Sequence, residues 1–194
     1  MFNFKSQLLG AAVLATGLIA SAGSAQAWTG KFSFDGDGTT AAINNAGFNF
    51  TAPNRIELGL KTGDFAGDAG GDIFDTIFAS LPPVFINIDG VGKELTVSSF
   101  TNPVFSAISG GVDISFNFKG MFEDGSNAIG NIDFTTFDFT NAGVAQTAYN
   151  DGTSINSVFK GVVVASVPEP TTMLGLGLVA AGMTVARRRK LVKA

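Results

Sequence analysis

Phenylalanine recurs at every second position in four short runs, and this spacing constrains the fold more than any other feature of the chain. The runs hold the pairs Phe32/Phe34, Phe48/Phe50, Phe116/Phe118 and Phe137/Phe139. Side chains two residues apart share one face of a β-strand, whereas a helix repeats every 3.6 residues. In residues 112–119, apolar side chains alternate with Asp, Ser, Asn and Lys. The pattern predicts half-buried strands with aromatic rings in the core.

Turn-forming sequences separate these runs. Examples are Asp35-Gly36, Pro53-Asn54, Asp89-Gly90, Ser109-Gly110, Asp124-Gly125 and Asp151-Gly152. Short strands with such punctuation predict an all-β domain over residues 28–166, as a β-sandwich or a jelly-roll-like fold. Within it, apolar side chains at helical spacing favour a short helix over residues 72–81. Residues 146–151 look like a loop.

The charges of residues 28–166 are strongly unbalanced. This segment carries six basic and fifteen acidic side chains, a net charge of −9, while the whole chain has −4. An acidic domain repels phosphate backbones, so we expect no nucleic-acid partner. The sequence contains neither cysteine nor histidine. Disulfides, histidine-based acid–base catalysis and His-ligated zinc sites are therefore excluded.

The first 27 residues have the three parts of a signal peptide. Lys5 supplies the positive start, residues 8–20 form an apolar run, and Ala25 and Ala27 flank an A-x-A cleavage site. We therefore expect a signal helix that directs the chain to Sec-type export machinery and is removed by signal peptidase. The mature chain would start at Trp28, which should fray or pack on an edge.

The C-terminal segment also has the features of targeting material. A short motif is followed by the apolar residues 171–186 and then by a basic cluster. The motif is Val167, Pro168, Glu169 and Pro170, and the basic cluster is Arg187, Arg188, Arg189 and Lys190. A helix of 16 residues spans about 24 Å, less than the hydrocarbon core of about 30 Å. We expect transient membrane insertion through this tail, with the basic stop on the cytoplasmic side.

Residues 167–190 closely resemble the PEP-CTERM sorting signal of bacteria that make exopolysaccharide. The resemblance implies recognition by an exosortase, a membrane cysteine protease that would remove the tail near Pro168–Pro170. It also implies an inner-membrane intermediate, followed by delivery to the cell surface or the extracellular matrix. The expected division is a signal peptide at 1–27, an all-β mature domain at 28–166 and a sorting tail at 167–194.

A glycine-rich segment supplies the candidate metal site. Asp64, Asp68, Asp72 and Asp75 lie within twelve residues on this flexible backbone. Calcium takes six to eight oxygen ligands, many from aspartate, and tolerates irregular geometry. Calcium is therefore a candidate cofactor at these four carboxylates, and the alternative is a solvated acidic loop.

Three functions fit these features. The leading interpretation is an exported surface or exopolysaccharide-matrix protein with a structural or interaction role and exopolysaccharide as a candidate partner. The second is a calcium- or carbohydrate-binding module, with Tyr149 as the candidate for sugar stacking. The third is a carboxylate-dependent glycoside-active enzyme, for which Glu57, Glu94 and Glu123 are available. No carboxylate pair stands out, so we expect no catalytic site.

Overall fold

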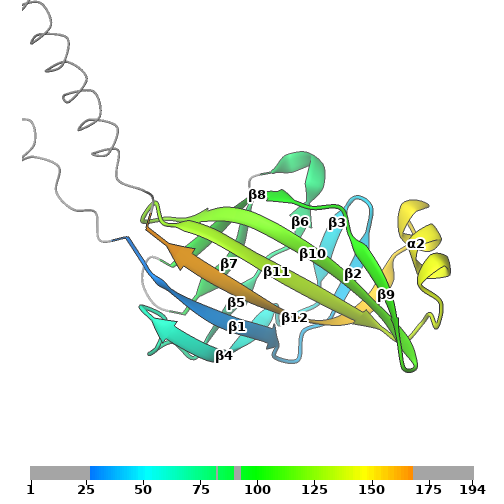
Figure 1. Cartoon of the computed structure of the whole chain (residues 1–194), viewed down its shortest axis with the longest axis horizontal. Coiled ribbons are helices and arrows are strands. Elements are labelled where there is room, and N and C mark those ends of the chain that lie inside the picture. The colour runs from blue at the N-terminus through cyan, green and yellow to red at the C-terminus, as the bar shows by residue number, and fades with distance from the viewer. Residues whose placement is uncertain (1–26, 82, 90–92, 168–194) are drawn as a thin grey trace, which may run out of the picture.

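A computed structural model describes residues 27–81, 83–89 and 93–167 of the chain (Figure 1). In these ranges most residues lie in β-strands, and one short α-helix and one 3-10 helix complete the secondary structure. Its elements are β1 (Gly30–Gly36), β2 (Ala41–Asn44), β3 (Gly47–Phe50), β4 (Arg55–Gly63), β5 (Gly70–Ile73), β6 (Thr76–Ile77), the 3-10 helix η1 (Phe78–Ser80), β7 (Val84–Ile88), β8 (Glu94–Phe100), β9 (Val104–Ile108), β10 (Gly111–Phe122), β11 (Asn127–Thr136), α2 (Ala142–Asn150) and β12 (Ile155–Ser166). The expected signal helix with Ala25, and the tail from Pro168 to Lys190, lie outside the described residues.

Eight antiparallel strands close into a barrel. Their order is β1-β4-β5-β7-β8-β10-β11-β12, and β12 pairs back with β1 from Gly30↔Ala165 to Asp35↔Lys160. The all-β prediction is confirmed, but the sandwich or jelly-roll prediction is corrected to a barrel. Alternating strands supply one buried face to either architecture, and only the pairing of the first strand with the last distinguishes them.

The predicted alternation holds in the strands whose sequences show it. In β10, Ile114, Phe116 and Phe118 are buried while Asn117 and Lys119 are exposed. The buried rings pack against one another inside the barrel, where the Phe48 centroid lies 5.0 Å from that of Phe116, edge to face, and 4.8 Å from that of Phe134, with the rings tilted. The aromatic pairs therefore form the core. The exception is Phe137, which follows the end of β11 and is 65% exposed.

Two glycines on inward-facing positions make room for these rings. A Cβ atom at Gly130 would lie 2.9 Å from Cε1 of Phe118, and one at Gly161 would lie 2.6 Å from Cε1 of Phe34. Real Cβ atoms do not approach carbon so closely, so neither position accepts a methyl group without movement of the ring. In both places, therefore, a phenylalanine ring on one strand fills the space beside a glycine on the neighbouring strand.

A small extension and a helix cover one end of the barrel. The start of β12 pairs with β2, which pairs with β3, and β3 pairs with β6. Helix α2, at residues expected to be a loop, packs beside β9 and β2. Its N-cap is Asn141, whose Oδ1 accepts hydrogen bonds from the amides of Gly143 and Val144. This cap is the local signal for the helix.

The prediction of a helix over residues 72–81 is wrong. The segment forms the end of β5, then β6, and only three residues of 3-10 helix. Its backbone groups are taken by neighbours, since Asp72 pairs with Arg55 and Asn87, and Thr76 pairs with Phe48. Long-range strand pairing therefore overrides the apolar spacing.

Both ends of the described chain lie at the same end of the barrel, and α2 lies at the other (Figure 1). Gly30 pairs with Ala165, one residue before the end of β12. β12 has twelve residues and runs from beside α2 to this end, and its eleven residue-to-residue steps of about 3.3 Å span about 36 Å. We call the end with α2 the distal end and the other the terminal end.

We expect Gly161→Ala to lower the free energy of unfolding by about 1–3 kcal/mol, because the methyl group would enter the space of the Phe34 ring. The matched control is Gly67→Ala, since no atom lies within 4 Å of a Cβ there. Urea unfolding followed by tryptophan fluorescence measures both. Equal midpoints for the two variants would contradict the tight interior.

Candidate functional site

A cleft opens at the distal end between α2, η1, β9 and the turn after β2. We call it the distal cleft, and its volume is about 630 Å³. Its walls combine amide side chains with aromatic rings. The lining residues are Asn45, Phe78, Leu81, Phe100, Thr101, Asn102, Pro103, Phe105, Phe116, Gln146, Tyr149 and Asn150. None of these described side chains carries a formal charge at neutral pH.

Tyr149 is the central polar residue of the distal cleft. Its ring is 5% exposed and packs at 5.6 Å, edge to face, on Phe105 and at 6.2 Å on Phe116. Burial disfavours the phenolate and raises the pKa of Tyr149 to about 12. Among the described residues no fully buried side-chain oxygen lacks a hydrogen-bond partner, so the hydroxyl, which has no partner there, reaches solvent. It is therefore a neutral donor and acceptor beside the cleft.

The backbone holds the amide groups in place. Asn45 Nδ2 donates to the carbonyl of Asn150 at 2.6 Å, and the Asn45 amide donates to the carbonyl of Tyr149 at 3.2 Å. These bonds join the turn after β2 to the last turn of α2. Gln146 and Asn150 lie four residues apart, on the same face of the helix. Uncharged amides beside aromatic rings suit a neutral ligand that is rich in hydroxyl groups.

The structure does not bring the four predicted calcium ligands together. Each carboxylate has its own partner: Asp64 accepts from the Thr29 amide at 2.7 Å, Asp68 from Lys93 at 2.6 Å, Asp72 from Arg55 at 2.9 Å, and Asp75 from the Phe50 amide at 2.7 Å. Among the described residues, no three acidic groups are close enough to hold a metal ion. The calcium hypothesis therefore gains no support from this geometry.

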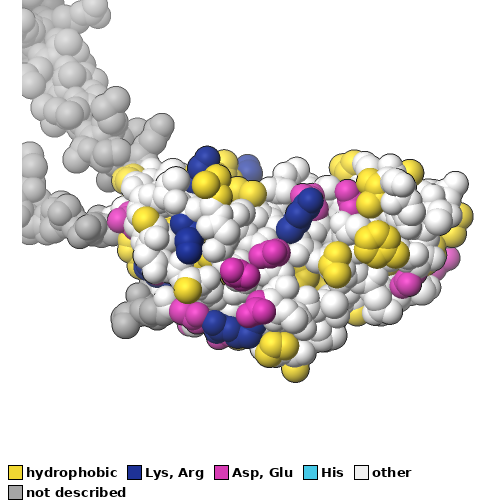
Figure 2. All heavy atoms as spheres, turned by 90° about the horizontal axis from the view of Figure 1, so that it is seen from below, with side chains coloured by type: hydrophobic (Ala, Val, Ile, Leu, Met, Phe, Trp, Pro, Cys, Tyr) yellow, Lys and Arg dark blue, Asp and Glu magenta, His cyan; other side chains and the backbone are white. Residues whose placement is uncertain are grey.

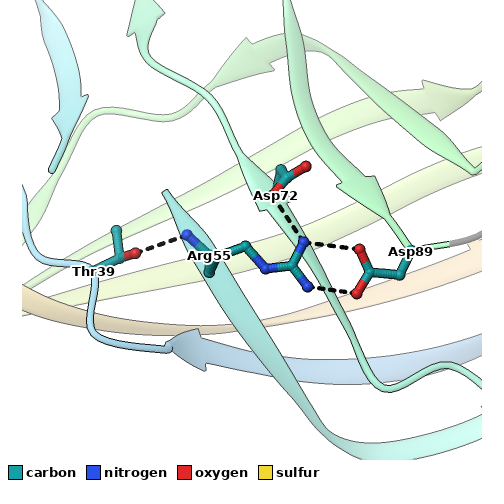
Figure 3. A network of polar contacts seen from close by, with 4 residues as sticks. All are labelled: Thr39, Arg55, Asp72 and Asp89. Carbon is teal, nitrogen blue, oxygen red and sulfur yellow. Dashed lines mark hydrogen bonds and ion pairs between the residues drawn. The ribbon is translucent and has the colours of Figure 1, made fainter. Parts of the chain in front are cut away.

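Asp72 belongs instead to a network around Arg55 (Figure 3). Arg55 Nη1 donates to Asp72 and to Asp89, at 2.9 Å each, and Nη2 donates to the second oxygen of Asp89 at 2.5 Å. The hydrogen bonds from Arg55 lower the pKa of Asp89, against the opposing effect of partial desolvation. Thr39 Oγ1 accepts from the Arg55 amide at 2.8 Å. The network ties β4 to β5 and to the end of β7.

The presence of an arginine is the one sequence signal for this network. Arg55 is the sole arginine of residues 28–166, and a planar guanidinium matches carboxylate geometry better than lysine does. The partners were not predictable, because Asp72 and Asp89 follow at distances of 17 and 34 residues.

Charges of both signs are interspersed on the side of the barrel that carries β1 and β4 (Figure 2). In the strand register, Lys160 lies between Asp35 on β1 and Asp133 on β11. Neighbouring opposite charges on strands are favourable, and they prevent a continuous acidic patch on this side.

The described residues define an all-β barrel with a neutral cleft at one end. No helix in these ranges is long and apolar enough to cross a membrane. In the C-terminal tail, residues 166–190 match the family model of the PEP-CTERM protein-sorting motif. No curated protein and no solved structure is significantly similar to the chain.

The chain therefore carries a PEP-CTERM sorting motif, which confirms the resemblance of Val167 and the residues after it. The motif identifies a protein that is sorted by an exosortase system. It implies Sec export and delivery to the cell surface or extracellular space through a membrane intermediate. The match covers about an eighth of the chain and includes only the last residue of the barrel, Ser166.

Removal of the Arg55 network should weaken the fold most at neutral pH. A depressed Asp89 pKa contributes stability above the ordinary value of 3.8, and this contribution is lost as pH falls through the folded pKa. The side chains are 35–46% exposed, so solvent screening limits the effect of Arg55→Met to about 0.5–1 kcal/mol. Urea midpoints from pH 7 to about pH 2.5 measure it.

Lys119→Met is the control for that experiment. It also removes one positive charge, but Lys119 is exposed and forms no ion pair within the described ranges. A difference between the two variants that persists undiminished at acid pH would argue against the network.

Tyr149 can be titrated directly, because it is the sole tyrosine of the chain. We expect its phenolate absorbance to rise with a midpoint near pH 12 in the folded protein and about 10 in denaturant. Burial favours the neutral form, so this stabilisation is complete below about pH 10 and is lost as pH rises through the folded pKa. Tyr149→Phe should remove that alkaline loss, while a folded-state midpoint near 10 would show that the ring is not buried.

Proposed function

We propose that the exported barrel is a surface or exopolysaccharide-matrix protein with an interaction role, and that it binds neutral carbohydrate chains in the distal cleft. The observation that carries the proposal is the uncharged lining of the cleft, which combines Tyr149 with the amide side chains of Asn45, Gln146 and Asn150. Sugar hydroxyls both donate and accept hydrogen bonds, as amides and tyrosine do. Aromatic walls suit the apolar faces of sugar rings.

The role of Tyr149 in this proposal is a hydrogen bond rather than stacking. Its ring is 5% exposed and covered by Phe105 and Phe116, so the face of the ring is not available to a sugar. The hydroxyl is the part of Tyr149 that we expect a ligand to contact. Phe78, which is partly buried and packs against Phe48, provides an apolar wall of the cleft.

The position of the cleft supports the same proposal. The sorting motif begins at the last residue of β12, at the terminal end of the barrel. A membrane intermediate held by this tail would carry the distal cleft on the side away from the tether, about 36 Å along β12. The cleft would then face the extracellular polymer before the tail is removed.

Proteolytic processing at both ends is part of the proposal. Signal peptidase would cleave after Ala27, and exosortase would remove the tail near Pro168–Pro170. The barrel and its buried core lie within residues 28–166, so the mature chain retains every strand. The glycoside-active alternative would require a pair of carboxylates, and the lining of the distal cleft holds none.

The test is co-sedimentation of purified residues 28–167 with the neutral fraction of exopolysaccharide from the producing strain. We expect Tyr149→Phe and Gln146→Ala each to weaken binding by about 2–10-fold, the effect of one hydrogen bond. Because the lining carries no carboxylate, EDTA should leave binding unchanged.

Asn127→Ala is the matched control, since Asn127 is an exposed amide on β11 that pairs with Ser166 at the terminal end. Loss of binding in this variant alone, or no effect of the two cleft variants, would rule out the distal cleft as the binding site. Binding that requires calcium would revive the alternative at the acidic loop.

A further inference from the structure

The backbone nitrogen of Trp28 lies in a polar site formed by the turn between β10 and β11. It is 2.6 Å from Asp124 Oδ2 and 2.6 Å from Ser126 Oγ. Ser126 is fully buried, and its amide donates to Asp124 Oδ1 at 2.8 Å. Its hydroxyl donates to the same carboxylate at 2.6 Å, which leaves the Ser126 oxygen free to accept.

The site offers two acceptors to the single hydrogen of the Trp28 peptide nitrogen, which the two oxygens share in a three-centre hydrogen bond. A peptide nitrogen carries one hydrogen, whereas two oxygens lie at equal distance from Trp28 N. One hydrogen cannot point straight at both, and hydrogen bonds weaken steeply away from linearity. An α-ammonium group carries three hydrogens and a positive charge. It would supply a separate donor to each oxygen and a counter-charge to Asp124.

The rest of Trp28 is also anchored, so of the two expectations for this residue, fraying or packing, the structure shows packing. Its ring packs edge-on against Phe122 at 5.5 Å and Phe65 at 6.5 Å. Lys93 Nζ lies 6.0 Å from the ring centroid and pairs with Asp68. The next amide, of Thr29, donates to Asp64. The predicted first residue of the mature chain is therefore held through both backbone and side chain.

We propose that Asp124 and Ser126 form a binding site for the α-ammonium group that cleavage after Ala27 creates at Trp28. The inference rests on the proposed removal of the signal peptide. If this site forms, signal-peptide removal stabilises the barrel, because the new amino terminus binds to the β10–β11 turn and so attaches the residues before β1 to that turn. The site is also specific for cleavage after Ala27, because cleavage several residues upstream would leave a peptide nitrogen, not an ammonium group, at Trp28.

The test compares two chains that both end at residue 167. One starts at Trp28 and the other retains Ala25, Gln26 and Ala27; each is released from a fusion by a protease that leaves no extra residue. Fluorescence of Trp28, the sole tryptophan, follows urea unfolding. We expect the folding equilibrium constant of the Trp28 chain to be about tenfold larger, the gain from a charge-assisted bond.

The same comparison is then made with Asp124→Asn in both chains, which gives a double-mutant cycle between the new amino terminus and the Asp124 carboxylate. Asparagine keeps an acceptor oxygen but removes the charge, so the tenfold difference should nearly disappear. A difference between the two chains that Asp124→Asn leaves unchanged would overturn the inference. Glu123→Gln is the matched control, because it removes a neighbouring exposed carboxylate and should leave the difference intact.

The pH dependence decides the question if Asp124→Asn does not fold. A cation that gains a partner stabilises the fold below its unfolded pKa, here about 8, and that contribution is lost as pH rises through the folded value. The other charged groups near Trp28, namely Lys93, Asp64 and Asp68, are the same in both chains. A stability difference that survives at alkaline pH would overturn the ammonium site.

Mass spectrometry of the secreted protein separates this inference from the proposed processing. A first residue other than Trp28 would refute cleavage after Ala27 and with it the inference. With Trp28 confirmed as the first residue, the cycle alone decides the site.

Discussion

Pairing between β1 and β12 turns a sheet into a closed barrel, and the core and the arrangement of the chain ends depend on this contact. Closure gives each of the eight barrel strands two hydrogen-bonded neighbours and so removes exposed edges. It also creates a narrow interior, which the phenylalanine rings fill. The interior is tight enough that Gly130 and Gly161 are needed opposite Phe118 and Phe34. The strand that closes the barrel also carries the chain from α2 to the sorting motif.

The local sequence pattern predicts the strands well, but it predicts the pairing of strands and the segments between them poorly. The alternation in β10 follows from side-chain geometry, so it is predictable without knowledge of the partners. Barrel closure depends on the register Gly30↔Ala165, which no single segment encodes. The same reason explains the wrong helix at residues 72–81, where strand pairing satisfies the backbone. Helix α2 has a local cap signal in Asn141, which a prediction of a loop at residues 146–151 overlooks.

The candidate site is less predictable than the fold. Spacing along the chain suggests that Asp64, Asp68, Asp72 and Asp75 converge, but each finds a partner from another strand or loop. Conversely, the distal cleft joins amides about a hundred residues apart, since Asn45 bonds to the carbonyl of Asn150. Amides are common in turns, so sequence carries no signal that these form a site. The sorting motif is predictable because its parts are contiguous.

The order of the strands links the completion of folding to the completion of export. β1 is the first strand and β12 the last, so the barrel cannot close until the end of the chain has arrived. Before that, β1 and β11 each lack the neighbour that β12 provides, and such open edges pair readily with other chains. The sorting motif starts where β12 ends. A chain truncated before β12 therefore lacks both the closing strand and the sorting tail. Molecules that cannot close the barrel thus also lack the motif that exosortase sorting requires.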